Sequence, residues 1–401
     1  MKKLIIPEGI KKLKTDAAGR YNPIDGGKLP GQVRFCSRCV ISNQRPRISF
    51  DKDGVCSACH FAEIKQTKID WAEREKMLKE VLDKYRRNDG NYDCVVPVSG
   101  GKDSCFTAHQ LKYKYNMHPL TVTFAPLRWT DVGWQNLKSL IDSGFSNELF
   151  IPDTYAYRLL TRLSTEYLGD PFQPFIYGVN TFPVQVALKY NIPLIFYGEN
   201  GEVEYGGDMR NADEFTHNVS TDIRDHYFKG MMPQDWEKFG VKKEYIKPFE
   251  IPNPEEVEKK GIKCTWMSFF KKWVPQENFY YAVENVGFQP NPDRSEGTYS
   301  KYASLDDRFD GFHYYFSFLK FGIGRATNDA AHEIRDKHIT REEGVSLVKK
   351  YDGEFPKKYF KEFLEYVDIT EDHFWKIVEK FRNPLIWEKQ NGEWKLKTQI
   401  K

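Results

Sequence analysis

The sequence predicts an α/β protein built on a doubly wound parallel sheet, with an N-terminal four-cysteine module and helical C-terminal additions. Short apolar, β-branched runs alternate with helical stretches between residues 93 and 197, a pattern typical of parallel sheets. One of these runs, residues 94–98, passes through two glycines directly into a helical stretch. Two Cys-x-x-Cys pairs precede the alternation, and a helical pattern follows residue 326.

The composition limits the class of protein. Basic and acidic residues number 60 and 57, so the net charge of +3 gives no general attraction to nucleic acid or anionic lipid. No apolar run approaches the roughly 20 residues of a membrane span, and the N-terminal apolar run is too short for a signal peptide. Paired cysteines are typical of a reducing compartment. We therefore expect a cytoplasmic protein with no membrane span and no nucleic-acid partner.

The first predicted units are a loosely ordered lead-in at residues 1–34, with turn signals at Gly26-Gly27 and Pro30-Gly31, and a zinc-knuckle module at residues 35–65. The two cysteine pairs of the module are separated by sixteen residues, a spacing that suits a tetrahedral Zn²⁺ site. Four protein ligands leave no open position, so the site is structural, and four unrelated thiols are the alternative. His60, which follows the second pair directly, is an additional candidate ligand of the metal. The predicted ligands are Cys36, Cys39, Cys56 and Cys59.

The predicted α/β domain spans residues 66–210 and begins with an amphipathic helix at 66–88. Its strands are expected at 94–98, 119–124, 149–151 and 192–197. Its helices are expected at 105–115, 130–143, 155–167 and 182–190.

The alternation fades beyond residue 210. We interpret residues 211–310 as an insertion or substrate region and residues 311–401 as a helical region that completes the site. The aromatic run at 312–321 is either a strand or a buried helix, and Thr340-Arg341-Glu342-Glu343 has the spacing of a capping box.

The glycine loop after residues 94–98 is the strongest functional signal. A strand, two glycines and a helix N-terminus point backbone N–H groups at one spot, which is an anion site. The spacing excludes a Walker A loop, which needs Gly-x-x-x-x-Gly-Lys-Ser/Thr. An ordinary β–α turn is the alternative. The sequence Ser-Gly-Gly-Lys-Asp-Ser at residues 99–104 resembles the PP-loop of ATP pyrophosphatases, which split ATP to AMP and pyrophosphate. The nucleotide-binding candidates are Ser99, Gly100, Gly101, Lys102, Asp103 and Ser104.

A second polar segment follows the strand at 192–197. Because the carboxyl ends of parallel strands share one edge, this segment and the loop are expected to face one pocket. Its acidic groups are candidates for Mg²⁺, with Asp103 and Glu199 or Glu202 as ligands, and a solvated acidic loop is the alternative. Gly198 is assigned to the cofactor, and the substrate candidates of this segment are Glu199, Asn200, Glu202 and Tyr205.

Three further groups of residues are weaker candidates. Lys320 and Arg325 flank a glycine-spaced turn and are expected to stabilise phosphates, with a solvated basic turn as the alternative. Asn180 lies with Gln173 and Tyr177 in a patch suited to sugar hydroxyls or a uracil ring. The thiols of Cys105 and Cys264 are either catalytic in sulfur transfer or, as we favour, simply buried.

Together these segments resemble the bacterial N-acetyl sugar amidotransferases of surface-polysaccharide synthesis, including lipopolysaccharide O-antigen, and of flagellin-glycan synthesis. The resemblance runs from about residue 34 to 380. It is carried by the cysteine pairs, Val-Pro-Val-Ser99-Gly-Gly-Lys-Asp-Ser104, Trp129-Thr-Asp-Val-Gly-Trp-Gln-Asn136, Tyr-Gly198-Glu-Asn-Gly-Glu202 and Lys320-Phe-Gly-Ile-Gly-Arg325.

The resemblance implies an adenine-nucleotide α-hydrolase-like fold and the conversion of an acetamido group to an acetamidino group. ATP would adenylate the amide oxygen, and ammonia would displace AMP, with Lys102, Asp103 and Arg325 as catalytic residues. It also implies partners: a glutaminase similar to that of imidazole-glycerol-phosphate synthase, and often a homologue of its barrel subunit. Lys2 replaces the cysteine of an N-terminal-nucleophile glutaminase, and no cysteine stands in a nucleophile elbow, which also favours a separate ammonia source.

Two other functions compete with this one. The first is a tRNA-thiolating or tRNA-modifying PP-loop enzyme, which the near-neutral charge and the lack of a basic, aromatic-interleaved tract disfavour. The second is a non-catalytic zinc-ribbon scaffold that senses nucleotide through the loop. The sequence does not name the sugar, the position aminated or the oligomeric state.

Overall fold

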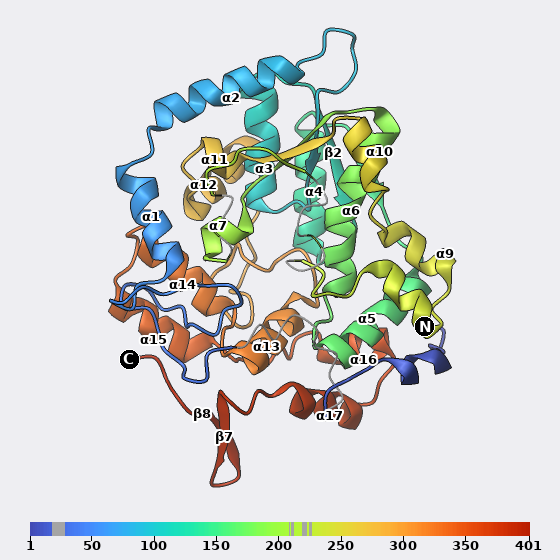
Figure 1. The fold of residues 1–401 in the computed structure, drawn as a ribbon, viewed down its shortest axis with the longest axis vertical. Coiled ribbons are helices and arrows are strands. Elements are labelled where there is room, and N and C mark those ends of the chain that lie inside the picture. Colours follow the sequence, from blue (N-terminus) through green and yellow to red (C-terminus); the bar gives the residue numbers. More distant parts are fainter. Residues whose placement is uncertain (18–28, 208, 210–211, 219–222, 224–226) are drawn as a thin grey trace.

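The fold is built on a six-stranded sheet, seen in a computed structural model that describes residues 1–17, 29–207, 209, 212–218, 223 and 227–401 (Figure 1). The strand order is β3-β2-β1-β4-β6-β5. The first five strands of this order run parallel, and β5 is antiparallel. This confirms the predicted doubly wound parallel sheet. The strands are β1 (Cys94–Pro97), β2 (Pro119–Phe124), β3 (Asn147–Phe150), β4 (Leu194–Tyr197), β5 (His217–Asn218) and β6 (Lys263–Trp266).

The sheet lies between two apolar cores, which explains why its central strands are continuous apolar runs. Successive side chains of a strand point to opposite faces. Val95 and Ile195 pair in register and belong to the core that contains α5 and α6. Val96 and Phe196 belong to the other core, with residues of α3, α4 and α12.

The helices on the two faces of the sheet follow the predicted pattern, with differences in where some of them begin. The helix expected at 66–88 is two helices, because Asp70 caps a new start by accepting from Ala72 N and Glu73 N. The helix expected at 182–190 begins at Gln173 and runs through Pro183, and the aromatic run at 312–321 is helical. The helices up to this point of the chain are α1 (Ser57–Thr67), α2 (Trp71–Tyr85), α3 (Lys102–His109), α4 (Asp131–Asp142), α5 (Thr154–Leu168) and α6 (Gln173–Tyr190), with a π-helical turn at Gln110–Lys114.

Residues 211–310 contribute two strands of the sheet and several short helices. β6 pairs in parallel with β4, and β5 pairs with β6. These strands escaped the sequence analysis because β6 has four residues, including Lys263 and Thr265, and β5 has two. The predicted domain boundaries themselves stay predictions. The short helix α7 (Gly201–Tyr205) precedes this region, and the described helices within it are η3 (Pro233–Phe239), α9 (Lys243–Ile246), η4 (Lys247–Phe249), α10 (Pro254–Lys259), α11 (Met267–Phe270) and α12 (Pro275–Val286).

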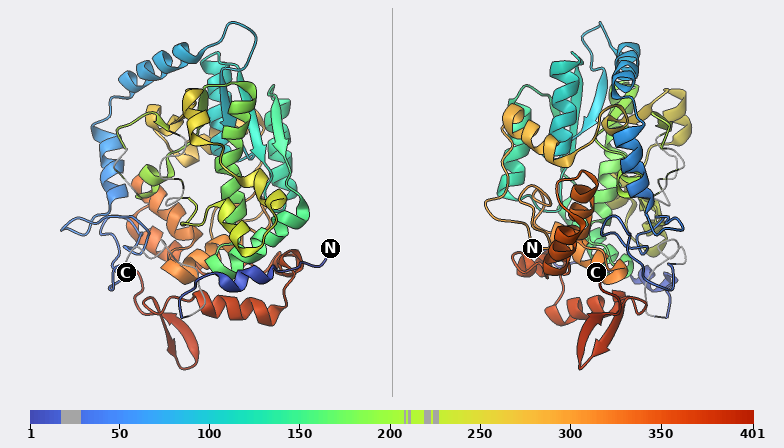
Figure 2. Two further views of the ribbon diagram at one scale, coloured as in Figure 1. Left: turned by 45° about the vertical axis from the view of Figure 1, so that its right-hand side comes forward. Right: turned by 90° about the vertical axis from the view of Figure 1, so that its left-hand side faces the viewer.

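The C-terminal region is helical, as predicted, and ends in a hairpin that projects from the end of the molecule opposite α2 (Figure 2). The expected capping box is present: Thr340 Oγ1 accepts from Glu343 N, and the Glu343 carboxylate accepts from Thr340 N. The elements are α13 (Asp310–Phe321), α14 (Arg325–Arg335), α15 (Arg341–Tyr351), α16 (Phe360–Val367), α17 (Glu371–Phe381), β7 (Trp387–Gln390) and β8 (Glu393–Leu396).

The expectation of a loosely ordered lead-in is wrong for its first part. Leu4, Ile10 and Leu13 are buried in the core that contains α5 and α16. They lie on and beside the short 3-10 helix η1 (Glu8–Lys12). The apolar side chains at the start of the chain therefore serve as packing groups. The expected turn at Gly26-Gly27 lies outside the described residues. Within the described part of the chain, every helix is too short or too polar to cross a bilayer.

Packing of α6 on the sheet gives a first prediction. A Cβ on Gly178 would overlap the ring of Phe124, which is held among Phe150, Phe182 and Phe249. We expect Gly178→Ala to lower the free energy of unfolding by about 1–3 kcal/mol through overpacking, as measured by urea denaturation. Gly31→Ala, with open space around the added carbon, is the matched control. Equal stability of the two variants would contradict the prediction.

Candidate functional site

The candidate site lies at the point of the sheet where the order of the strands reverses, between β1 and β4. Strands β2 and β4 flank β1, so the β1 and β4 loops meet at the topological switch point, where open α/β sheets bind ligands. Gly100 has φ +83°, and a Cβ there would lie 2.6 Å from Leu137 N of α4. Only glycine lets the loop pass this close to the helix. The predicted common edge for the two polar segments is therefore present.

The loop leads straight into a helix N-terminus. Gly101 is the N-cap of α3 and supplies no side-chain cap, so the first N–H groups of the helix remain available to an anion. Ser104 Oγ donates to Gly101 O at 2.9 Å, which fixes the turn. The α3 helix begins at Lys102, three residues earlier than expected, and so Lys102 stands on its first turn.

Asp103 is the fixed carboxylate of the loop. Lys102 Nζ donates to Asp103 Oδ2 at 2.5 Å, and Asn278 Nδ2 of α12 donates to Asp103 Oδ1 at 3.0 Å. Asn278 is buried and was missed by sequence reasoning, because nothing local to α12 signals a contact with the loop. The pair of donors holds the carboxylate in one orientation at the mouth of the anion site.

The C-terminal half of the chain closes over the loop through Asp306. Burial together with the nearby Asp310 raises the pKa of the Asp306 carboxyl to about 6, and the Ser99 hydroxyl beside this carboxyl partly offsets the rise. The segment is locked in place, since Thr130 N donates to Asp306 O at 3.1 Å and a Cβ on Gly133 would lie 2.5 Å from Asp306 Cα. The sequence analysis missed Asp306, because the residues on either side of it in the sequence are typical of an ordinary polar turn.

The segment after β4 divides its residues between the site and the scaffold. Burial, and then the charge of Asp103, raises the pKa of Glu199 to about 7. Asn200 caps α7 by accepting from Glu202 N and Val203 N. Arg47 holds the Glu202 carboxylate with two bonds of 2.9 and 2.6 Å. Glu199 is thus the carboxylate placed beside Asp103, and the assignment of Mg²⁺ to Asp103 and Glu202 stays a prediction.

Arg325 and Tyr205 lie on the side of the site opposite the loop, within electrostatic reach of each other. Arg325 opens α14, donates to Asp329 Oδ1 at 3.0 Å and to Tyr314 OH at 2.6 Å, and its charge reaches Asp306 and Tyr205. The helices α13 and α14 therefore lie beyond the carboxyl edge of the sheet, opposite the loop (Figure 1).

Lys320 and Asn180, the other candidates on this side, have different neighbours. Lys320 Nζ donates to Leu168 O at 3.3 Å and lies within electrostatic reach of the buried Asp170. Asn180 Nδ2 donates to Ile176 O within α6. Of the patch around Asn180, Gln173 and Tyr177 are fully buried, donating to Tyr227 O and Met231 O. The roles assigned to Lys320 and Asn180 stay predictions.

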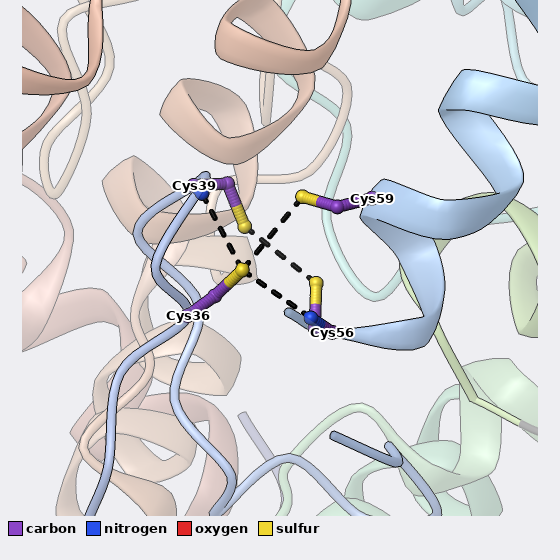
Figure 3. A group of neighbouring side chains, drawn as sticks. All are labelled: Cys36, Cys39, Cys56 and Cys59. Carbon is purple, nitrogen blue, oxygen red and sulfur yellow. Dashed lines mark hydrogen bonds between the residues drawn. The ribbon is translucent and has the colours of Figure 1, made fainter. Parts of the chain in front are cut away.

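The four paired cysteines form a compact, buried cluster (Figure 3). The sulfur atoms of Cys36 and Cys59 are 3.8 Å apart, and those of Cys39 and Cys56 are 3.7 Å apart. A Zn–S distance of about 2.3 Å in a tetrahedron gives an S···S edge of about 3.8 Å. The cluster therefore has the geometry of a site for one tetrahedral ion. A cubane cluster would interpose several iron and sulfide ions and hold the cysteines further apart.

The cysteine module is attached to the site segment after β4. His60, the spare candidate ligand, instead bonds to Asp51 at 2.7 Å. Lys65 of α1 forms a buried ion pair with Glu204 of α7 at 2.7 Å. A Cβ on Gly206 would lie 2.8 Å from Ala58 Cβ. Because α1 begins at the second cysteine pair, a metal that fixes the module also fixes the position of α7.

The other three cysteines, at 94, 105 and 264, are all buried, as we favoured for Cys105 and Cys264. Burial raises the pKa of the Cys105 thiol to about 12. A thiol of this kind is a poor nucleophile near neutral pH.

Comparison with known proteins links the C-terminal quarter of the chain to a polysaccharide pathway. Residues 296–401 match the family model described as the C-terminal domain of WbpG-like LPS biosynthesis proteins. A curated relative, the uncharacterized protein MJ1599 of Methanocaldococcus jannaschii, is 28% identical over 88 residues. That match covers 22% of this chain and spans less than a third (31%) of the relative.

Three solved structures share weak similarity. The NH3-dependent NAD synthetase of Campylobacter jejuni has a TM-score of 0.29 and 11% identity, over 56% of this chain and 100% of that one. The NMN synthetase of Francisella tularensis has a TM-score of 0.28 and 11% identity, over 57% and 100%. The U34-tRNA thiolase NcsA of Methanococcus maripaludis, solved with its 4Fe–4S cluster, has a TM-score of 0.28 and 13% identity, over 86% and 88%. Scores this low carry no functional argument, and the fold class rests on the strand order.

The cysteine cluster predicts a bound metal ion. We expect the purified protein to contain one metal ion per chain by elemental analysis, and Cys39→Ser to lose it, because three thiolates hold a tetrahedral ion less tightly than four. The variant should also melt at a lower temperature, since the ion stabilises the folded module. Cys94→Ser, outside the cluster, is the control for metal content. Retention of the full metal content by Cys39→Ser would contradict the assignment.

The pKa of Glu199 predicts how stability depends on pH. The folded state raises this pKa from 4.5 to about 7, so between these values the folded protein binds more protons than the unfolded chain. Stability therefore falls as pH rises through this window and is constant above it, as far as this group is concerned. We expect Glu199→Gln to remove the fall, so that the variant gains stability relative to the native protein from about pH 4.5 to 7. Parallel melting-temperature curves for the two proteins would contradict it.

Proposed function

We propose that this protein is an ATP-dependent amidotransferase that converts the acetamido group of an N-acetylated sugar to an acetamidino group, with release of AMP and pyrophosphate. The observation that carries the proposal is the contact between Ser99 of the loop and Asp306. Asp306 and Arg325 belong to the segment that matches the LPS biosynthesis family. A segment associated with glycan biosynthesis thus forms the opposite wall of an anion site of PP-loop sequence.

The first step is activation of the amide. The acetamido oxygen attacks the α-phosphorus of ATP, an O–P bond forms, and the bond to the β-phosphate breaks to release pyrophosphate. The N–H groups at the start of α3 and the Lys102 ammonium face the departing phosphates, and Arg325 adds positive charge from α14. Their contribution is orientation and charge stabilisation rather than covalent chemistry.

The second step replaces oxygen by nitrogen. Ammonia attacks the imidate carbon, a C–N bond forms, and the C–O bond breaks to release AMP. The nitrogen sheds a proton in this step, and Glu199, with its pKa near neutrality and its place beside Asp103, is suited to accept it. Tyr205, on the same segment, would contact the sugar.

Two metals belong to the proposal. Asp103, with Glu199 or Glu202, would hold Mg²⁺, which neutralises phosphate charge when bound. Zn²⁺ would occupy the four-cysteine cluster as a structural ion, because four protein ligands leave it no open position. The sulfur separations support a single ion of this type rather than an iron–sulfur cluster.

Ammonia is proposed to come from a partner glutaminase similar to that of imidazole-glycerol-phosphate synthase, with a barrel-subunit homologue as a further partner. This part of the proposal rests on the sequence resemblance. Thiolation of tRNA, the competing reaction, is disfavoured by the burial of Cys94, Cys105 and Cys264.

The test is direct assay of both half-reactions. The protein is incubated with ATP, Mg²⁺, ammonium chloride and a panel of nucleotide-linked acetamido sugars. We expect AMP together with a sugar product lighter by the mass difference between O and NH. Lys102→Ala should lower kcat at least about 100-fold, the typical cost of removing one preorganised charge, with unchanged metal content in the cysteine cluster. AMP formation without sugar modification across the panel would overturn the proposal.

A further inference from the structure

His332 is a buried histidine near the candidate site, and the proposed function gives it no role. It lies on α14 seven residues after Arg325, so the two side chains share one face of the helix with Asp329. Its ring centroid is 4.5 Å from that of Tyr205, in an edge-on arrangement. The residue is 6% exposed, and its Nε2 atom is shielded from solvent and makes no hydrogen bond within the described part of the chain.

A second unpaired polar atom lies on the adjacent segment. Glu204 precedes Tyr205 on α7, and its Oε2 accepts from Lys65, whereas its Oε1 is buried with no partner among the described residues. Arg335 Nη2, one turn beyond His332, approaches Glu204 O at 3.5 Å. Buried polar atoms in folded proteins are nearly always paired, so the unpaired His332 Nε2 and Glu204 Oε1, on two segments that meet through Tyr205, indicate a small polar ligand.

The charges around His332 define the chemistry of that ligand. Burial and the charges of Arg335, Lys65, Lys102 and Arg45 hold the pKa of His332 well below its usual value. Arg335 lies on α14 itself, Lys65 on α1, Lys102 on α3 and Arg45 in the loop of the cysteine module, and the Glu204 carboxylate of α7 is paired with Lys65. The imidazole is therefore neutral at physiological pH, and one of its nitrogens accepts a hydrogen bond. The same cations oppose a charged ammonium ion in this space.

We infer that the buried Nε2 of His332 marks the subsite for neutral ammonia, in which His332 accepts an N–H and leaves the nitrogen lone pair free. The inference rests on the proposed function and assigns a position to its nucleophile. His332 is a positioning residue here. The subsite lies on α14 beside Tyr205, and Lys102 of the loop is within electrostatic reach of His332. Water has similar size and polarity, and it is the competing occupant.

The test separates amide activation from ammonia use. His332→Gln and His332→Phe are compared with the native protein, and exposed His338→Gln is the matched control. With a sugar that supports turnover, we expect the KM for ammonium chloride at fixed pH to rise about tenfold in His332→Phe, as for loss of one hydrogen bond. Its kcat at saturating ammonium should stay within about threefold, and His332→Gln should recover part of the KM. Sugar-dependent exchange of pyrophosphate into ATP, measured without ammonia, should match the native rate.

Each result decides between the alternatives. An unchanged KM for ammonium in both His332 variants overturns the subsite and favours a structural water. Equal losses of pyrophosphate exchange and of ammonia-dependent turnover also overturn it, because His332 would then act in activation or folding. If the native protein shows no sugar-dependent pyrophosphate exchange, the proposed function fails instead.

Discussion

The parallel pairing of β1 with both β2 and β4 is the constraint on which the site depends. It brings the loop that starts at Ser99 and the segment that starts at Gly198 to one edge, although about a hundred residues separate them. Gly100 then lets α4 approach within contact distance of the loop. Once this edge is set, the C-terminal region packs over it and brings Asp306 and Arg325 toward the loop.

The cysteine module acts on this edge at a distance. The helix α7 has five residues, too few to be stable alone, and it depends on its Asn200 cap and on α1. The buried pair of Lys65 and Glu204 joins the two helices. Such a pair adds little net stability, because desolvation offsets the Coulomb attraction, but breaking it is costly. Its effect is positional: it ties Tyr205 to the cluster of cysteines, so a structural metal and the site behave as one unit.

The site also gathers charges of both signs that scarcely compensate one another. Burial raises the pKa values of Glu199 and Asp306 toward neutrality, and the charge of Asp103 adds to the rise for Glu199, that of Asp310 to the rise for Asp306. Lys102 and Arg325 oppose them from two helices. Ionisable groups with shifted pKa values are concentrated at functional sites. The combination of carboxylates and cations suits the binding of a phosphate-bearing ligand with a divalent cation, next to an amide that is to be activated.

The sequence by itself determined the sheet, the loop and the cysteine cluster, because each is encoded by neighbours in the chain: apolar runs, glycines before a helix, and paired thiols. It did not determine the partners of those elements. The contacts of Asp306 with Ser99, of Asn278 with Asp103 and of Arg47 with Glu202 join residues 155–207 positions apart. No local pattern encodes such contacts, because they exist only after distant helices pack on the sheet. The same packing buried His332 and left its nitrogen without a partner, a feature that only the tertiary structure decided.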